Sequence, residues 1–268
     1  MIDDIGAEQV EAAFMYDYET GMPEAARTRL GVSAARIGGG VAVAMAADPT
    51  TYWSKALGFG LTEPFTLDLF DEILDFYRGS GVKQAVLQLI PAVLPAGFAE
   101  AAAVRGVERG TTWIKLGGDP ARVAATATDL RIGPVPAEQA EAFAGTVLDT
   151  FGMPAGDLTT MLASTVGRPG WQPYAAWDGD LIVAGGNLYL HDGGAGLNAA
   201  ATRAEYRRRG AQGALIAARA AAAADAGCTR VYAETGKPAP HAHNPSLANM
   251  LKAGLTPLYE RENWLWRR

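Results

Sequence analysis

Three consecutive arginines, Arg207, Arg208 and Arg209, stand directly before two closely spaced glycines, Gly210 and Gly213. Arginine carries a charged fork of donors that suits phosphate oxygens, and glycine leaves the backbone open to a bound group. The alanine-rich segment that follows is expected to be a helix. Its first amides have no acceptor within the helix and carry the positive end of its dipole. These features predict an anion-binding site at the start of that helix.

The elements that must position this site are predicted from hydrophobic patterns and turn residues. A strand bent near Gly185 and Gly186 should be followed by a tight turn and an antiparallel return strand that leads into the arginines. The helix should end at Gly227, before a buried strand rich in β-branched and aromatic residues. The expected ranges are strands 181–190, 197–202, 229–235 and 262–267 and helices 209–226 and 245–253, with Trp264 and Trp266 on one face of the last strand.

The first half of the chain shows the same order of elements. Helix 67–77, strand 82–89, helix 95–104 and strand 111–116 place Gly81 and Gly106 in the positions of Gly227 and Gly254. This correspondence predicts a divergent tandem repeat, with a first domain at 1–125 and a second at 126–268. In the first copy, Pro64 takes the position of Gly210 and lies beside Glu63. Because proline lacks an amide and a carboxylate repels phosphate, we expect the first copy to have lost anion binding.

The arginine-rich turn differs from two familiar phosphate-binding motifs. No Gly-Lys-Ser or Gly-Lys-Thr follows it, and the Gly-x-Gly-x-x-Gly spacing of dinucleotide-binding folds is missing. However, the step from Arg207 to Gly210, the strand before it, the long helix after it, and the later Ser246-x-x-Asn249 and Gly254-Leu255 patterns resemble the GCN5-related N-acetyltransferases (GNAT). The resemblance covers about 140 residues, from Asp129 to the C-terminus. The whole chain also resembles tandem members of that family such as mycothiol synthase.

The resemblance implies an α/β (α+β) fold with two tandem GNAT-like domains. Each would hold a mixed, mostly antiparallel sheet flanked by helices, and the N-terminal domain would be degenerate. Acetyl-CoA would be the co-substrate, with its pyrophosphate on the amides of the turn and its pantetheine paired with a strand that splays from its neighbour. The implied cofactor-binding residues are Ala200, Thr202, Arg207, Arg208, Arg209, Gly210, Ala211, Gln212, Gly213, Ser246 and Asn249.

The sequence departs from the family pattern at two positions. Gln212 stands where glycine or alanine is usual, and Met250 stands where a tyrosine often protonates the leaving thiolate. Tyr259, Tyr232 or a water is then the expected proton donor, or the thiolate leaves without one. We expect Tyr259 to be catalytic together with Glu234 and His241.

Each of these assignments has a structural alternative. The arginine cluster can be a solvated helix start, and Glu234 can simply pair with a lysine or arginine. His241 and His243 lie in a proline-rich loop, where either can contact substrate or carry a proton. Without a third ligand they do not predict a metal site. Ser246 and Asn249 can cap a helix instead of contacting the cofactor.

Other reactive or aromatic residues are expected in the core. Cys228, the single cysteine, follows a helix-ending glycine and precedes a buried strand, so it is expected to be a core residue and not a nucleophile. The tryptophans Trp171, Trp177, Trp264 and Trp266 are expected to pack in cores and on sheet faces, with an acceptor pocket as the alternative.

Composition narrows the classes of partner. The 23 Lys and Arg against 29 Asp and Glu give a net charge of −6, which opposes a broad nucleic-acid-binding surface. The start of the chain is acidic where a secretory signal needs positive charge, and the most apolar segment, 85–104, contains two prolines and a glutamate. We therefore expect a cytoplasmic protein without a membrane partner, as a monomer or homodimer.

The expected function is transfer of an acyl group, most simply acetyl from acetyl-CoA, to a primary amine of a small molecule, by direct attack in a ternary complex. Three alternatives stay open at this point. The fold can use another acyl donor such as an aminoacyl-tRNA, act as a non-catalytic acyl-CoA-binding regulator, or modify a macromolecule in the manner of a toxin. The acidity of the chain speaks against tRNA.

Overall fold

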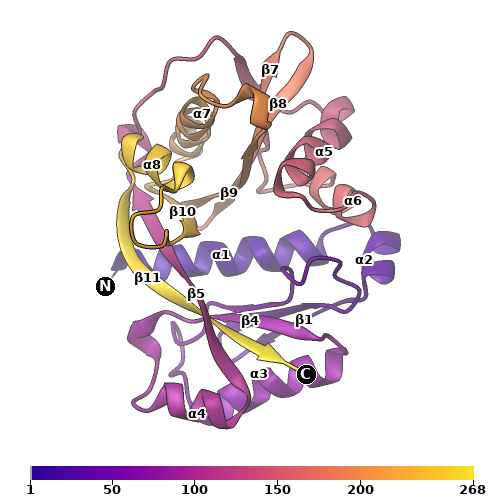
Figure 1. Ribbon diagram of the computed structural model, residues 1–268, viewed down its shortest axis with the longest axis vertical. Helices are drawn as coiled ribbons and strands as arrows, with labels where there is room; N and C mark the ends of the chain where they lie inside the picture. Colours follow the sequence, from indigo (N-terminus) through magenta and orange to yellow (C-terminus); the bar gives the residue numbers. More distant parts are fainter. Residues whose placement is uncertain (1) are drawn as a thin grey trace. The chain divides into compact units, whose positions relative to one another are not determined.

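The computed structural model describes residues 2–268, with the side chains of 5–268. The chain divides into two compact units. Unit 1 comprises Met1–Ile114 and Tyr259–Arg268, and unit 2 comprises Lys115–Leu258. Each unit combines helices with a mostly antiparallel set of strands, so the predicted mixed α/β fold class is confirmed (Figure 1).

In unit 1, a meander of three antiparallel strands is extended by a parallel neighbour. Strand β2 pairs antiparallel with both β1 and β3, and β3 pairs in parallel with β4. Strand β4 in turn pairs antiparallel with the C-terminal strand β11. The elements of this unit are α1 (Ile2–Thr20), α2 (Glu24–Leu30), β1 (Val32–Ile37), β2 (Gly40–Met45), β3 (Lys55–Leu57), α3 (Leu67–Ser80), β4 (Gln84–Gln88), a 3-10 turn (Pro91–Val93), α4 (Phe98–Val104), most of β5 (Val107–Gly118) and most of β11 (Thr256–Arg267).

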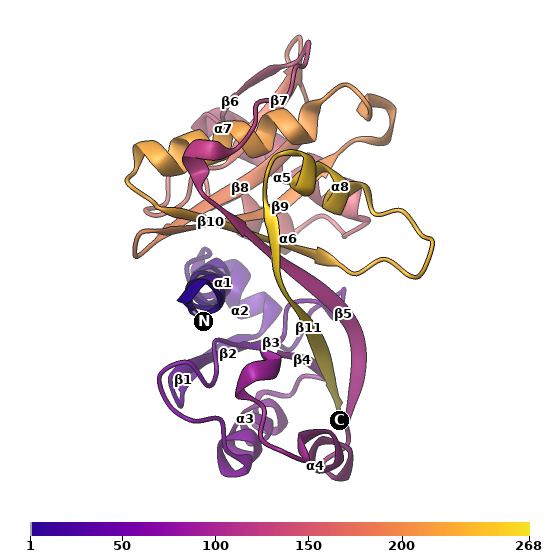
Figure 2. The same ribbon diagram turned by 90° about the vertical axis from the view of Figure 1, so that its left-hand side faces the viewer.

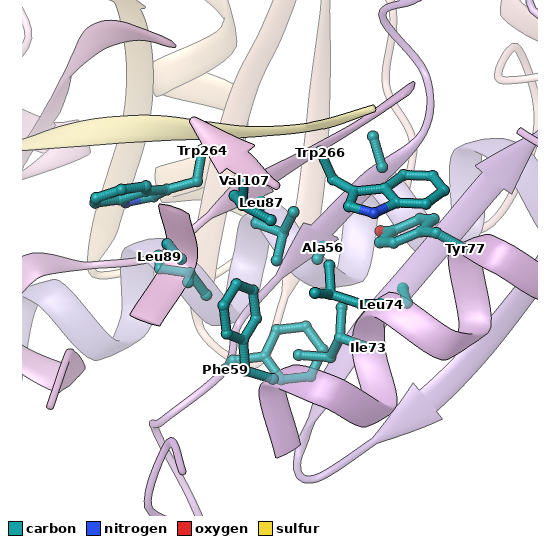
Figure 3. Close-up of a cluster of buried hydrophobic side chains, with 14 of the residues drawn as sticks. Ala56, Phe59, Ile73, Leu74, Tyr77, Leu87, Leu89, Val107, Trp264 and Trp266 are labelled. Carbon is teal, nitrogen blue, oxygen red and sulfur yellow. The ribbon is translucent and has the colours of Figure 1, made fainter. Parts of the chain in front are cut away.

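Helix α3 forms where apolar residues recur at helical spacing. Leu69, Phe70, Ile73, Leu74 and Tyr77 are buried on one face and pack into the core of unit 1. Figure 3 shows this core, in which α3 faces strand residues such as Leu87 and Val107. The side chains of Trp264 and Trp266 from β11 enter the same core, and the ring of Trp266 lies next to that of Tyr77, 6.0 Å between centroids (Figure 3).

In unit 2, helices cover both faces of the strands that lead to the arginine cluster. Figure 1 shows α7 on one side of β8 and β9 and α5 and α6 on the other. The elements are a 3-10 turn (Pro120–Arg122), β6 (Arg131–Pro134), a 3-10 turn (Ala137–Gln139), α5 (Ala140–Phe151), α6 (Asp157–Ala163), β7 (Tyr174–Asp178), β8 (Leu181–His191), β9 (Gly194–Thr202), a 3-10 turn (Ala204–Tyr206), α7 (Ala211–Asp225), β10 (Arg230–Gly236), α8 (Pro245–Lys252) and the start of β11.

The order of pairing in unit 2 repeats that of unit 1. Strands β6 to β9 are antiparallel neighbours, and β9 pairs in parallel with β10 across α7, as β3 pairs with β4 across α3. Gly81 and Gly227 follow α3 and α7 with φ of +74° and +81°, and Gly106 and Gly254 follow α4 and α8 with φ of +72° and +97°. Positive φ favours glycine at a helix end, which is why these residues mark the repeat in the sequence.

Strand β11 differs most from the expectation. It begins at Thr256, not near residue 262, and its residues from Tyr259 onward belong to unit 1, so the compact units do not follow the expected division at 125/126. The charged residues at its centre hid its length: Arg261 is fully buried and pairs with Glu8 at 2.6 Å and Glu11 at 2.8 Å, both on α1. A charge can be buried within a strand when such partners are present, and the partners lie about 250 residues away in sequence.

Strand β8 bends where the sequence predicted. Its pairing with β9 shifts between Gly185 and Asn187, so that Gly186 opposes both Ala199 and Ala200. A Cβ on Gly185 would lie 2.5 Å from the ring of Phe143 on α5, and one on Gly186 would lie 2.7 Å from the guanidinium of Arg219 on α7. The two glycines therefore admit one large side chain on each face of the strand.

Candidate functional site

The turn before α7 contains a run of backbone amides without hydrogen-bond acceptors among the described residues. Arg208 and Gly210 both have positive φ, +65° and +81°, and Gly210 caps α7 without a side-chain hydrogen bond. The first hydrogen bond of the helix runs from Ala214 N to Gly210 O at 3.0 Å. Within the described part of the chain, the amides from Arg208 to Gly213 find no acceptor. Successive amides in such a turn form a concave surface for an anion, and the helix dipole adds to it.

The equivalent helix of unit 1 begins in a different way. Thr66 caps α3 with its side chain, which accepts from Leu69 N at 3.1 Å, while Phe70 N donates to Thr66 O at 3.0 Å. The residue before it, Phe65, is buried in the core. Thr66 therefore satisfies donors that α7 leaves open.

The three arginines are not equivalent. Arg209 forms ion pairs with Asp129 and with Asp178, the latter at 2.8 Å. These contacts hold the pKa of each aspartate below its usual value and raise that of Arg209. Arg207 and Arg208 are exposed, and Arg207 donates to Thr202 O at 3.4 Å. Of the three predicted anion ligands, the Arg209 side chain is thus occupied by carboxylates.

The two glycines of the turn serve a purpose that the sequence did not reveal. A Cβ on Gly210 would lie 2.2 Å from Ala127 O, and one on Gly213 would lie 2.3 Å from the Thr126 hydroxyl. The segment that joins β5 to β6 crosses α7 at this point (Figure 2), and Thr128 donates to Arg209 O at 2.7 Å. On the sides where Cβ atoms would stand, Gly210 and Gly213 make room for the chain itself and not for a phosphate.

Other predicted cofactor residues gather at the end of β9. Gln212 does not obstruct the turn with its long side chain, because its Nε2 donates to the Thr202 hydroxyl at 2.8 Å. Ala211 is buried as the first residue of α7, and Ala200 lies in the bulge of β9.

Strand β9 separates from β10 in the direction of the turn. The parallel register covers Gly194 to Gly196 on β9 and ends at Tyr232 on β10, while β9 continues to Thr202 and β10 to Gly236. Ala199 has a φ of +50° within the bulge. The side-chain nitrogen of Asn198, which sequence reasoning did not single out, is buried there without an acceptor among the described residues. The pairing of β9 with β10 therefore ends at Gly196, as the predicted splay requires. Beyond this residue, the backbone N–H and C=O groups of β9 that face β10 are not paired with it.

Glu234 lies on β10 with its carboxylate 2.9 Å from Nζ of Lys115 on β5. The lysine is 3% exposed and the glutamate side chain 15% exposed. The alternative that Glu234 pairs with a basic residue is therefore realised, and any proton transfer at this carboxylate takes place beside an ammonium group. His241 and His243 are exposed in the loop that projects after β10 (Figure 2), and His241 has a φ of +65°.

Tyr259 lies in unit 1, where its hydroxyl donates to Glu8 beside Arg261. Burial and the neighbouring Glu8 raise its pKa well above its usual range. Its expected role as a proton donor to the leaving thiolate stays a prediction. Tyr232 is buried on β10.

Helix α8 is capped by a residue that the sequence analysis overlooked. Asn244 accepts from Ser246 N at 2.9 Å and Leu247 N at 3.1 Å, and its amide donates to Gly236 O at 2.7 Å, which ties the helix to the end of β10. The signal was the Asn-Pro pair at the helix start. Ser246 and Asn249 do not supply the cap, and Met250 is buried.

The residues expected in the core are found there. Cys228 is buried, donates to Gly194 O at 3.4 Å, and has a pKa raised by burial, as expected of an unreactive thiol. Trp171, Trp177, Trp264 and Trp266 are all buried.

A separate cavity of about 290 Å³ lies between α5 and the start of β8. Asp149, Asp180 and Arg203 contribute to its lining, and Arg203 donates to the Thr146 hydroxyl at 3.0 Å. These residues come from three distant segments, so no sequence motif announced them. None of them belongs to the turn before α7.

Among the described residues there is neither a metal-binding cluster nor a membrane-spanning helix. No three His, Cys, Asp or Glu side chains from this part of the chain are grouped so as to hold a metal ion. No helix there has both the length and the apolar character needed to span a bilayer.

Comparison with known proteins places the site in a family context. The acetyltransferase (GNAT) family model matches residues 149–244, which include β8, β9, the arginine turn, α7 and β10. No match was found among curated protein sequences. The predicted resemblance to GNAT acetyltransferases is confirmed, whereas the narrower resemblance to mycothiol synthase is not.

Solved structures share the arrangement over nearly the whole chain. A GCN5-related N-acetyltransferase from Kribbella flavida is 17% identical, with 91% of this chain and 93% of that chain covered and a TM-score of 0.61. A tandem GNAT protein from the clavulanic acid biosynthesis pathway is 15% identical, with 98% and 92% covered and a TM-score of 0.59. A GCN5-related N-acetyltransferase from Sphaerobacter thermophilus is 12% identical, with 100% and 93% covered and a TM-score of 0.58. At these identities the likeness shows a shared fold, including the tandem architecture.

Proposed function

We propose that unit 2 is an acyl-CoA-dependent N-acyltransferase that transfers acetyl from acetyl-CoA to a primary amine of a small molecule. One observation carries the proposal: the amides from Arg208 to Gly213 lack acceptors, and Arg207 and Arg208 are exposed beside them. A diphosphate supplies several acceptor oxygens and negative charge at one place, which matches a row of amides at a helix start. The match of residues 149–244 to the acetyltransferase family supports the same conclusion.

The splay of β9 supports a path for the rest of the donor. Beyond Gly196, β9 is no longer in register with β10, so its backbone groups can pair with the amide-containing arm of coenzyme A. Ala200 and Thr202 lie on this stretch. The acyl group would then lie near the bulge, where strand amides can polarise its carbonyl.

The reaction is a direct attack. The acceptor nitrogen bonds to the thioester carbon, the carbon–sulfur bond breaks, and coenzyme A leaves as a thiolate, whose modest basicity lets it depart without an acid. The proton released by the amine passes to Glu234, directly or through water, while Lys115 holds that carboxylate in place. His241, on the exposed loop, is the second candidate to carry this proton. The remaining contribution is orientation of the two substrates.

The test is thiol release from acetyl-CoA in the presence of a panel of small primary amines. We expect release to depend on both the protein and an amine, with the acetylated amine identified by mass spectrometry. Glu234→Gln and His241→Ala should lower turnover more than coenzyme A affinity if either residue carries the proton. Binding of coenzyme A without amine-dependent release would identify a regulator and not an enzyme, and absence of binding would refute the proposal as a whole.

A further inference from the structure

Arg219 is a fully buried arginine on α7, six residues before the end of the helix. Its guanidinium donates to Asn187 O at 2.9 Å and to Asn198 O at 3.4 Å, and its Nε donates to Leu215 O at 3.0 Å. All of these acceptors are backbone carbonyls. Among the described residues, no carboxylate lies within ion-pair distance of it. Burial lowers its pKa to about 10, so it stays charged at neutral pH.

A buried cation without a counter-ion is costly, and an apolar side chain of similar length would suit a core better. The position of this cation is therefore informative. Asn187 and Asn198 oppose each other on β8 and β9, immediately beside the bulge formed by Gly186 against Ala199 and Ala200. Arg219 thus joins the two strands at the point where β9 bulges.

The geometry also connects Arg219 to an amide in the bulge. In a planar trans peptide, the carbonyl and the following N–H point in opposite directions. When Asn198 O faces Arg219, the N–H of Ala199 faces away from it. A positive charge on the carbonyl end of a peptide makes its N–H a stronger donor. Ala199 has its unusual positive φ at this peptide, which shows that the local backbone is held in place.

We propose that Arg219 is a positioning residue for acyl transfer: it holds the bulge of β9 in its present form and strengthens the bulge amides as donors to the acyl carbonyl. This inference rests on the proposed function. Gly186 is needed for the same arrangement, because a side chain at this position would occupy the space that the Arg219 guanidinium fills. Arg219 itself does not contact the substrate.

The test measures the carbonyl stretching band of acetyl-CoA, labelled with ¹³C at the thioester carbon, when it is bound to the protein, alongside coenzyme A affinity by calorimetry. In the wild type we expect the band at lower frequency than in free acetyl-CoA. Arg219→Gln removes the charge and Gly186→Ala displaces the guanidinium, so both should lose most of this shift, whereas Arg219→Lys should keep it.

Coenzyme A affinity should change by less than about threefold in all of these variants, since the amides of the turn supply it. A variant merely loosened in structure should keep the shift, and Ala220→Gly, at a buried position of the same helix, is that control.

The outcomes separate the two proposals. Two results would overturn the role of Arg219. The first is a carbonyl band of bound acetyl-CoA at the free frequency in the wild type, and the second is the same band frequency in the wild type and in Arg219→Gln. If Arg219→Gln does not fold, Gly186→Ala decides in the same way. A wild type that binds no coenzyme A refutes the proposed function itself.

Discussion

The three consecutive arginines Arg207, Arg208 and Arg209 have different environments, although they are neighbours of one type. Arg209 is held by two aspartates, whereas Arg207 and Arg208 remain exposed beside amides without acceptors. The sequence predicts that the cluster lies at a helix start. It does not tell which arginine is neutralised, because Asp129 and Asp178 are 80 and 31 residues away in the chain.

Charge reversal should separate these roles. In Arg207→Glu or Arg208→Glu, coenzyme A affinity should fall by about 10- to 100-fold, since a hydrogen bond between charged groups contributes roughly 1.5–3 kcal/mol. Calorimetric titration with coenzyme A measures this effect. Arg78→Glu, an exposed arginine in the last turn of α3, makes the same change in net charge and should leave affinity unaltered. Equal losses in all three variants would mean that net charge alone governs binding.

A pH titration of Asp129 and Asp178 tests the role of Arg209 as their partner. Hydrogen bonds from Arg209 hold the pKa values of Asp129 and Asp178 below 3.8, so these pairs stabilise the fold at higher pH and lose that effect as the pH falls through the lowered values. In Arg209→Gln, carboxyl-carbon NMR titration should show both midpoints raised toward 3.8. Asp71, held by Arg105, is the internal control and should titrate as before. Unchanged midpoints for Asp129 and Asp178 would show that Arg209 does not set them.

At the scale of elements, α3 and α7 occupy equivalent places but start differently. The side chain of Thr66 caps α3, while Gly210 leaves the start of α7 uncapped and packs against Ala127. The sequence shows the absence of the capping residue. It does not show that the linker between the repeats rests on the same turn, because that contact joins segments about 80 residues apart.

Glycine substitutions test this packing. Gly210→Ala should lower the free energy of unfolding by about 2 kcal/mol or more, because alanine is strained at a φ of +81° and its Cβ collides with Ala127 O. Gly145→Ala, inside α5 with open space around the position, should raise it by about 0.5–1 kcal/mol. Denaturant unfolding followed by circular dichroism compares the two. A neutral Gly210→Ala would show that the linker does not press on the turn.

At the scale of the whole molecule, two copies of one arrangement differ in their helix starts and in their cores. Both place a helix between parallel strands. The turn before α7, the paired Lys115 and Glu234, and the bulge next to Arg219 all lie in unit 2. Unit 1 instead packs a large aromatic core that includes Trp264 and Trp266.

Hydrogen exchange with and without coenzyme A should show this division. The amides from Arg208 to Gly213 have no acceptor, so they should exchange fast in the free protein and become protected when the diphosphate accepts from them. The amides of Leu69 and Phe70 already donate to Thr66, so their exchange should change little. Protection that appears at the start of α3 instead would place the ligand in unit 1.

The sequence by itself determined the repeat, the bend of β8 at Gly185 and Gly186, and the helix start at the arginines, because these depend on local backbone preferences and spacing. Only the tertiary structure decided that β11 extends through a buried Arg261, that the glycines of the turn admit the linker, and that Arg219 lies behind the bulge. Each of these depends on burial and charge compensation between groups far apart in the chain, and local sequence preferences carry no record of such partners.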